Sequence, residues 1–326
     1  MKAAIVGIAG PELLPEEAAL FREQPPAGVI LFGRNIRDPA QLAGLIAALK
    51  APLPQQADLM VDQEGGRVAR LRPPHWQSHP AAGIIGASPS PNRTAGLTGA
   101  LIGAECAAAG FTVVAAPVLD LRVRGAHEGA VGDRAYSAGP LDVARLGRAM
   151  AEGLMAAGIM PVGKHCPGHG RAVVDSHLAL PRVSANDLDA DIQPFALNAD
   201  LPWMMTAHIV YDALDHALPA TLSPRVIETV IRGRIGFKGV LVTDDLAMNA
   251  LSGAPADRAT AALAAGCDLA VYCSGAFPLT QALLRAVPAV TPAASERMAA
   301  ARALLAGKRQ ALDVAALAAE RAGLLA

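Results

Sequence analysis

The feature that most constrains the fold of this chain is an eightfold alternation of short apolar runs and longer Ala/Leu-rich stretches. The apolar runs have the length and composition of buried strands, and they lie at residues 3–8, 28–32, 58–62, 112–116, 159–165, 203–209, 239–243 and 269–273. The longer stretches have helical length and lie at 15–22, 39–49, 93–109, 141–157, 187–199, 223–234, 255–265 and 277–286. Near-continuous apolar strands separated by helices indicate a parallel sheet that is covered on both faces.

Eight such units predict α/β architecture closed into a single (β/α)8 TIM barrel. The tail 292–326 is rich in Ala, Leu and Arg, which predicts an extra C-terminal helical segment outside the barrel. No linker or change of composition divides the chain, so we expect one domain over residues 1–326. An open doubly wound sheet is the alternative that the pattern leaves open.

Composition and charge exclude several classes of partner. The chain is 52% hydrophobic with a net charge of −1, which permits a large core and provides no electrostatic attraction for nucleic acid or an anionic membrane surface. Its 4 cysteines form no CxxC pair, which is typical of reduced thiols. The N-terminal residues lack the long apolar region of a signal peptide, and no run reaches the ~18 apolar residues of a spanning helix. We therefore expect a cytoplasmic protein.

Polar residues recur where the predicted strands end, which is the end of a barrel that carries active sites. They are Asp62, Asp120, Lys164 with His165, His208, and Asp244 with Asp245. Solvation of strand ends explains any one of these residues. It explains less well the two adjacent pairs, each of which is followed by a structured loop.

The loop GKHCPGHGRAVVDSHLALP, at 163–181, carries three histidines, a lysine and an aspartate. Four of its side chains are possible metal ligands: His165, His169, Asp175 and His177. Lys164 would repel a cation there, and no HExxH pair is present, so we expect no metal. A turn with solvated histidines is a second interpretation. The third is acid–base chemistry, in which Asp175 accepts a hydrogen bond from His177 and raises its basicity.

Two further segments carry candidate residues. The apolar run before Asp244 places a carboxylate at the barrel rim, which suits a nucleophile, although an aspartate there can also cap a following helix. The segment VDQEGGRVAR, at 61–70, sets carboxylates and arginines around a Gly-Gly turn and suits sugar hydroxyls or a carboxylate. It matches no phosphate-binding pattern.

At these residues the sequence resembles glycoside hydrolase family 3, in particular its single-domain bacterial β-N-acetylglucosaminidases. That subfamily has KHFPGHG followed by D-[ST]-H-x-x-LP, and this chain has KHCPGHG followed by DSHLALP. The family's strand ending SDDLxM corresponds to TDDLAM at 243–248. DQEGGRV, GDR at 132–134, GVILFGRN at 28–35 and AGCDLAV at 265–271 follow in the family's order, so the resemblance covers about residues 7–274.

The resemblance implies a retaining mechanism without a cofactor. In it, Asp244 is the nucleophile that forms a glycosyl-enzyme intermediate, and His177, polarised by Asp175, is the acid and base. The residues implied to bind the sugar are Asp62, Arg70, Arg134, Lys164 and His165. The implied substrate is a small carbohydrate, a 1,6-anhydro-muropeptide of cell-wall recycling, from which terminal β-linked N-acetylglucosamine is removed. We expect a monomer.

The chain departs from the family pattern at three places. Cys166 replaces an aromatic residue, Arg171-Ala172 replaces Asp-Thr, and the stretch 122–129 differs from the usual one. Arg171 adds a charge beside the acid–base loop that could favour an anionic leaving group. Alternatives that stay open are a family 3 β-glucosidase or xylosidase, transfer to phosphate, a metal-dependent barrel hydrolase, and a non-catalytic sugar-binding protein.

The assignment of the catalytic pair predicts that Asp244→Asn and His177→Ala each abolish glycosidase turnover and leave the protein folded, because each removes a group that reacts. Activity and circular dichroism measured on the same preparations check this. Near-normal turnover at either position would contradict the role given to that residue.

Overall fold

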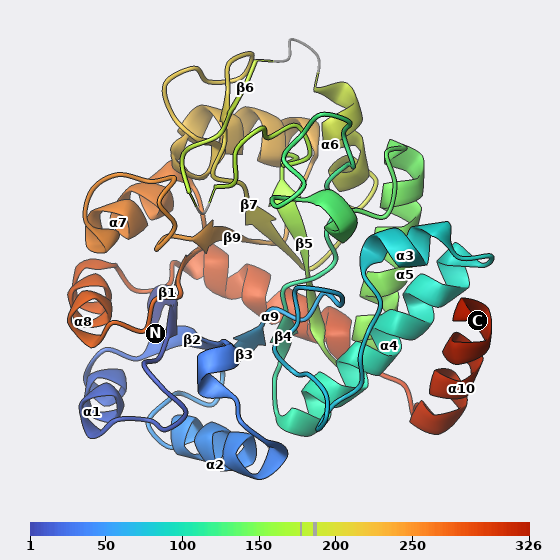
Figure 1. Cartoon of the computed structure of the whole chain (residues 1–326). Coiled ribbons are helices and arrows are strands. Elements are labelled where there is room, and N and C mark those ends of the chain that lie inside the picture. The colour runs from blue at the N-terminus through green and yellow to red at the C-terminus, as the bar shows by residue number, and fades with distance from the viewer. Residues whose placement is uncertain (177, 185–187) are drawn as a thin grey trace.

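Eight parallel strands close into a barrel in the order β1-β10-β9-β7-β5-β4-β3-β2 (Figure 1). The computed structural model describes residues 1–176, 178–184 and 188–326. The barrel strands are β1 (Lys2–Gly7), β2 (Pro26–Leu31), β3 (Asp58–Val61), β4 (Val113–Val114), β5 (Met160–Cys166), β7 (Trp203–Thr206), β9 (Val240–Asp245) and β10 (Leu269–Tyr272). Because β1 pairs with both β2 and β10, the sheet is closed. The predicted barrel is confirmed, and the open sheet is excluded.

Helices surround the barrel (Figure 1). They are α1 (Pro15–Glu23), α2 (Pro39–Lys50), α3 (Ala82–Ala87), α4 (Pro91–Ala109), α5 (Pro140–Ala156), α6 (Asp189–Ala196), α7 (Pro255–Ala265), α8 (Phe277–Ala286), α9 (Pro292–Ala306) and α10 (Val314–Leu325). Helices α1, α2, α4, α5, α7 and α9 each begin with a proline, whose fixed φ suits the first helical position. Among the described residues, none of these helices is long and apolar enough to cross a bilayer.

Several predicted elements differ in extent from those observed. The predicted strand 112–116 pairs only over β4, and the predicted strand 203–209 ends early, with β7. A further strand, β8 (Val210–Tyr211), begins just beyond the predicted end. Strand β8 pairs with β6 (Arg182–Val183) outside the barrel. The predicted helix 223–234 forms a π-helix over Val226–Arg234, and the tail forms two helices, α9 and α10. Residue 187, where another predicted helix begins, lies outside the described residues.

The barrel interior and the layer between sheet and helices are both apolar, because successive strand residues point to opposite faces. Along β1, Ala3 and Ile5 belong to the interior cluster, whereas Ala4 and Val6 belong to the cluster under the helices. Helix α9 contributes Met298 to the interior cluster and packs against β5 and β9. The interior core is thus covered by a helix, and polar side chains gather where the strands end.

Helices α4 and α5 make the most extensive helix–helix contact of the described chain, and glycines permit it. A Cβ atom added at Gly99 would lie 2.1 Å from the carbonyl oxygen of Met150, and one at Gly153 would lie 2.2 Å from the carbonyl oxygen of Gly96. Neither backbone can yield without separating the helices. The close approach therefore depends on the absence of side chains at these positions.

We predict that Gly99→Ala lowers the free energy of unfolding by about 1–3 kcal/mol, because the methyl group forces α4 and α5 apart. Gly44→Ala is the matched control, since Gly44 lies exposed inside α2 with nothing within 4 Å of an added Cβ. That substitution should raise stability by about 0.5–1 kcal/mol through helix propensity. Urea unfolding of both variants measures the difference, and equal effects would contradict the packing argument.

Candidate active site

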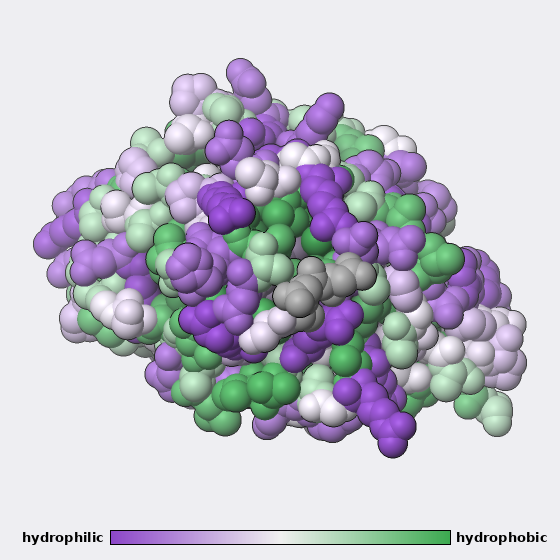
Figure 2. Space-filling model, turned by 90° about the horizontal axis from the view of Figure 1, so that it is seen from above, coloured by the Kyte–Doolittle hydropathy of each residue, from purple (hydrophilic) through white to green (hydrophobic). Residues whose placement is uncertain are grey.

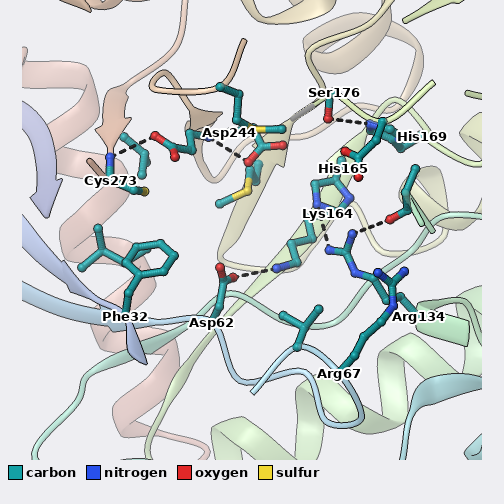
Figure 3. Close-up of a pocket in the computed structure, with 18 of the residues that line it drawn as sticks. Phe32, Asp62, Arg67, Arg134, Lys164, His165, His169, Ser176, Asp244 and Cys273 are labelled. Atoms are coloured by element: carbon teal, nitrogen blue, oxygen red, sulfur yellow. Dashed lines mark hydrogen bonds and ion pairs between the residues drawn. The ribbon is translucent and has the colours of Figure 1, made fainter. Parts of the chain in front are cut away.

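A cavity of about 210 Å³ lies where the barrel strands end, and the predicted site residues surround it (Figure 3). Its lining includes seven of the eight predicted residues, namely Asp62, Arg70, Arg134, Lys164, His165, Asp175 and Asp244. The eighth, His177, lies outside the described residues. Figure 2 looks down on the end of the molecule that carries β6 and α6, where hydrophilic side chains surround small apolar areas. The residues come from strands and loops far apart in the sequence and meet at one place.

Four members of a row of five alternating charges line one wall of the cavity, and the fifth, Glu64, is absent from its described lining. Asp62 accepts hydrogen bonds from Arg70 Nη2 at 3.2 Å and from Lys164 Nζ at 2.8 Å. Glu64 lies 2.7 Å from the same ammonium group, and it receives two bonds from Arg134, at 2.9 and 2.7 Å. The order along the row is Arg70, Asp62, Lys164, Glu64, Arg134. Every charge in the row therefore has an opposite charge beside it.

These contacts decide the ionisation of the row. Burial opposes ionisation of Glu64, but the charges of Arg134 and Lys164 outweigh it and hold the pKa of this carboxyl well below its usual range. The pKa of Asp62 is lowered against the same burial by Lys164 and Arg70. Burial would lower the pKa of Lys164, yet the two carboxylates raise it. The row is fully ionised at neutral pH.

Asp120, completely buried past β4, holds the start of the loop 163–181. Its carboxylate accepts a hydrogen bond from His165 Nδ1 at 2.7 Å and from the backbone N–H of His169 at 2.6 Å. His165 Nε2 faces the cavity side, 3.4 Å from Arg134 Nη2. Burial opposes ionisation of Asp120, but the imidazole of His165 outweighs it and lowers the pKa of the carboxyl. The carboxylate thereby orients His165 and fixes its tautomer.

The two aspartates that end β9 have different surroundings. Asp244 lines the cavity, and its Oδ1 accepts a hydrogen bond from the backbone N–H of Asp245 at 2.8 Å. Burial alone would raise its pKa, but the imidazoles of His165 and His208 and this backbone bond lower the pKa to about 2. The carboxylate of Asp245 accepts instead from the backbone N–H groups of Ala247 and Cys273. Asp245 holds the strand end, while Asp244 presents an ionised carboxylate to the cavity.

The loop 163–181 lines the cavity at its beginning, with Lys164 and His165, and again further along. His169 is buried, and its Nε2 lies 3.2 Å from Ser176 Oγ. Burial and the neighbouring His165 lower the pKa of His169 to about 4, so the ring is neutral at neutral pH. Asp175 and Ser176 line the cavity, next to His177, which is not described. The contact between Asp175 and His177 stays a prediction.

Arg171, the departure beside this loop, is directed away from the cavity. Its Nε donates to Asp191 Oδ2 at 2.6 Å, and Asp191 is buried in α6. Arg171 is absent from the described lining of the cavity. The guanidinium group of Arg171 therefore pairs with Asp191 and ties the loop to α6. The lining of the cavity gives no support to the hypothesis that Arg171 favours an anionic leaving group.

Sequence reasoning left several site residues without a role. Glu64 and Arg67 stand in the segment 61–70 and Asp120 follows a predicted strand, so a signal existed for each. Arg67 donates to the carbonyl oxygens of Gly129, Glu128 and Val131, and so holds the loop 128–131 at the cavity. The contacts of Arg67 could not be predicted from the sequence, because they join segments about sixty residues apart.

Within the described part of the chain, no group of three His, Cys, Asp or Glu side chains is arranged to hold a metal ion.

Comparison with known proteins gives the class of this barrel. The model for the glycosyl hydrolase family 3 N-terminal domain matches residues 11–306. Curated relatives include the beta-hexosaminidase of Alkalilimnicola ehrlichii, 40% identical over 90% of this chain and 86% of the relative, and that of Pseudomonas aeruginosa, 38% identical over 90% of each chain. The chain therefore belongs to glycosyl hydrolase family 3, and it is a glycoside hydrolase by class.

Solved structures within this family agree with the fold. The structure of NagZ from Neisseria gonorrhoeae in complex with N-trifluoroacetyl-D-glucosamine covers 100% of this chain and 98% of its own, with a TM-score of 0.87 and 31% identity. A family 3 β-N-acetylglucosaminidase from Paenibacillus has a TM-score of 0.80 at 32% identity, over 94% of this chain and 61% of that one. The resemblance seen at the sequence motifs thus extends to the whole barrel.

We predict that Glu64→Gln lowers the free energy of unfolding at pH 7 by about 3–5 kcal/mol, because it leaves Lys164 and Arg134 under-compensated in a buried place. Asp133→Asn is the matched control. It removes a carboxylate from an exposed pair with Arg67, an interaction of about 0–1 kcal/mol. Urea unfolding measures both variants, and similar losses would contradict the argument.

The pH dependence provides a second check. The pKa of Glu64 is depressed in the folded protein, so its stabilising effect is present at neutral pH and is lost as the pH falls below the usual glutamate value of 4.5. The stability difference between wild type and Glu64→Gln should therefore narrow from pH 7 to pH 3. A difference that stays constant over this range would exclude the ionised carboxylate as its source.

Proposed function

We propose that the protein is a retaining β-N-acetylglucosaminidase that removes terminal, non-reducing β-linked N-acetylglucosamine. The observation that carries the proposal is the placement of Asp244, ionised and at a strand end, in the same small cavity as the charged row. The names of the curated relatives support the sugar class. The glucosamine derivative bound to the gonococcal NagZ supports the size and kind of the ligand.

The charged row and His165 provide the sugar-binding part of the proposal. Sugar hydroxyls donate and accept hydrogen bonds, so they fit a wall on which carboxylates and cations alternate. Asp62 holds Arg70 and Lys164, and Glu64 holds Lys164 and Arg134, before a sugar arrives. These contacts reduce the cost of ordering the side chains on binding. Phe32 is the one phenyl ring in the described lining, which suits one terminal sugar better than a long polymer.

The first chemical step is attack of the Asp244 carboxylate on the anomeric carbon. A bond forms between the carboxylate and that carbon, and the bond from the carbon to the leaving oxygen breaks. The backbone N–H of Asp245 holds Oδ1 at 2.8 Å, so the second oxygen is the one available for attack. With its pKa near 2, Asp244 is ionised throughout the range in which such an enzyme works.

Proton transfer is assigned to His177 with Asp175. The imidazolium gives its proton to the leaving oxygen in the first step and, as a base, takes a proton from water in the second. Asp175 and Ser176 line the cavity, which supports placing the acid–base group on this loop. His169, beside Ser176, is neutral at neutral pH, so it is not a proton donor that would compete with His177.

The finer proposal concerns the substrate and the working form of the chain. We propose a 1,6-anhydro-muropeptide of cell-wall recycling as substrate, and a cytoplasmic monomer in which residues 1–326 act as one domain. The docking of α10 supports the single domain, because Arg321 of this helix is buried and its Nη1 lies 2.6 Å from His79 Nδ1. Sedimentation measures whether the protein is a monomer. Assays with nitrophenyl glycosides of other sugars test the sugar preference, and the same assays with and without phosphate separate hydrolysis from transfer to phosphate.

The test of the function combines turnover with trapping. We predict hydrolysis of a chromogenic β-N-acetylglucosaminide and, with a slow fluorinated N-acetylglucosaminyl fluoride, a sugar adduct on Asp244. Asp244 and Asp245 share the tryptic peptide 239–258, so fragment ions are needed to separate them. Asp257→Asn, at an exposed position of the same peptide, is the control that keeps the adduct, and Asp244→Asn should lose it. Absence of turnover and of an adduct from folded protein would overturn the proposal.

A further inference from the structure

His208 follows β7 and is completely buried, yet the mechanism above gives it no part. It is absent from the described lining of the cavity, so it is not placed to touch a substrate. Its two ring nitrogens each have a hydrogen-bond partner, and one of these partners is the backbone of the residue after Asp244. We propose that His208 is a positioning residue that holds the Asp244 carboxylate in its attacking orientation through the backbone of Asp245.

The hydrogen bonds of His208 fix its tautomer. Its Nε2 lies 3.0 Å from the carbonyl oxygen of Asp245, and its Nδ1 lies 2.8 Å from Thr221 Oγ1. A carbonyl oxygen can only accept, so Nε2 carries a hydrogen toward Asp245. The Thr221 hydroxyl has two acceptors within hydrogen-bond distance, Nδ1 of the neutral ring at 2.8 Å and the carbonyl oxygen of Ala207 at 3.0 Å. Burial lowers the pKa of His208, in agreement with a neutral ring. The imidazole is therefore a directed connector, with a donor toward Asp245 and an acceptor toward Thr221.

A second hydroxyl completes the chain of hydrogen bonds. Thr206 Oγ1, at the end of β7, lies 2.8 Å from Thr221 Oγ1. The Thr221 hydroxyl also lies 3.0 Å from the carbonyl oxygen of Ala207, and either threonine can be the donor in the Thr206–Thr221 pair. The chain runs Thr206 to Thr221 to His208 to the carbonyl of Asp245, all within buried surroundings. It links the end of β7 to the turn that follows β9, its neighbour in the barrel.

Asp245 connects His208 to the nucleophile, because its carbonyl contacts His208 and its N–H donates to Asp244. Its carboxylate is held by the backbone N–H groups of Ala247 and Cys273, the latter drawn as a dashed line beside Asp244 in Figure 3. Its carbonyl is held by His208, and its own N–H holds Asp244 Oδ1. Release of the carbonyl would let the turn rotate, and the N–H that orients Asp244 would move with it. This inference rests on the proposed role of Asp244 as nucleophile.

Two substitutions separate the donor toward Asp245 from the rest of the ring. In His208→Gln, the side-chain Nε2 is as many bonds from Cα as the histidine Nε2, so the donor to the Asp245 carbonyl can be kept. In His208→Asn, the amide reaches only the position of Nδ1, and that donor is lost. Asparagine should slow trapping by the fluorinated glycosyl fluoride and lower kcat by roughly 10- to 100-fold with KM little changed. Glutamine should restore both to within about threefold of wild type.

The leaving group separates a nucleophile defect from an acid–base defect. A dinitrophenyl leaving group needs no protonation, so Asp175→Ala should regain most of its rate with that substrate. His208→Asn should stay slow with it, because attack by Asp244 is still impaired. If His208→Asn does not fold, Thr221→Val carries the test, since it removes the hydroxyl that contacts His208 Nδ1 and keeps the side-chain shape. It should show the same pattern to a smaller extent.

The outcomes are distinct. Slow trapping by His208→Asn with rescue by His208→Gln supports the positioning role. A wild-type trapping rate in His208→Asn, or equal losses in both variants with a raised KM, overturns it and leaves the proposed function intact. Failure of wild-type protein to form an adduct on Asp244 overturns the proposed function and this inference together.

Discussion

The ammonium group of Lys164 is buried at the end of β5, and the cavity end of the barrel is arranged around the compensation of its charge. Two carboxylates, Asp62 and Glu64, reach it from the segment after β3, and each carboxylate also binds an arginine. A buried charge without a partner costs several kcal/mol, so none of the five members can move alone. The same constraint that keeps the row ionised keeps it rigid, and rigid donors and acceptors are what recognition of a sugar requires.

Two other carboxylates, on the buried Asp120 and the half-buried Asp245, accept hydrogen bonds from backbone N–H groups. Asp120 accepts from the N–H of His169 as well as from the ring of His165, and so ties the start of the loop 163–181 to the segment after β4. Asp245 accepts from the N–H groups of Ala247 and Cys273, and so ties β9 to β10. Strand ends expose backbone donors that the sheet no longer satisfies, and buried carboxylates satisfy them strongly. The carboxylate of Asp244, which lines the cavity, is oriented by the backbone N–H of Asp245.

Much of the fold could be predicted, and the misses have local causes. The strands 3–8 and 28–32 were recognisable because their apolar runs are long and uninterrupted. The strand 203–209 was predicted too long, because Ala207 and Ile209 continue the apolar run although β7 ends at Thr206. Seven of the eight predicted site residues surround one cavity, since strand-end polarity and motif both mark them. Glu64, Asp120 and His208 received no role, because their partners lie outside their own segments.

The sequence by itself determined the eight strand–helix units, the barrel that they form and the end at which polar groups collect. These follow from hydrophobic period and proline placement, which act over a few residues. Tertiary structure alone decided which charges pair. Lys164 meets Asp62 across 102 residues, Arg134 meets Glu64 across 70, and His208 meets the carbonyl of Asp245 across 37. Local pattern cannot rank such partners, because each contact exists only after barrel closure has brought the strand ends together and removed water from between them.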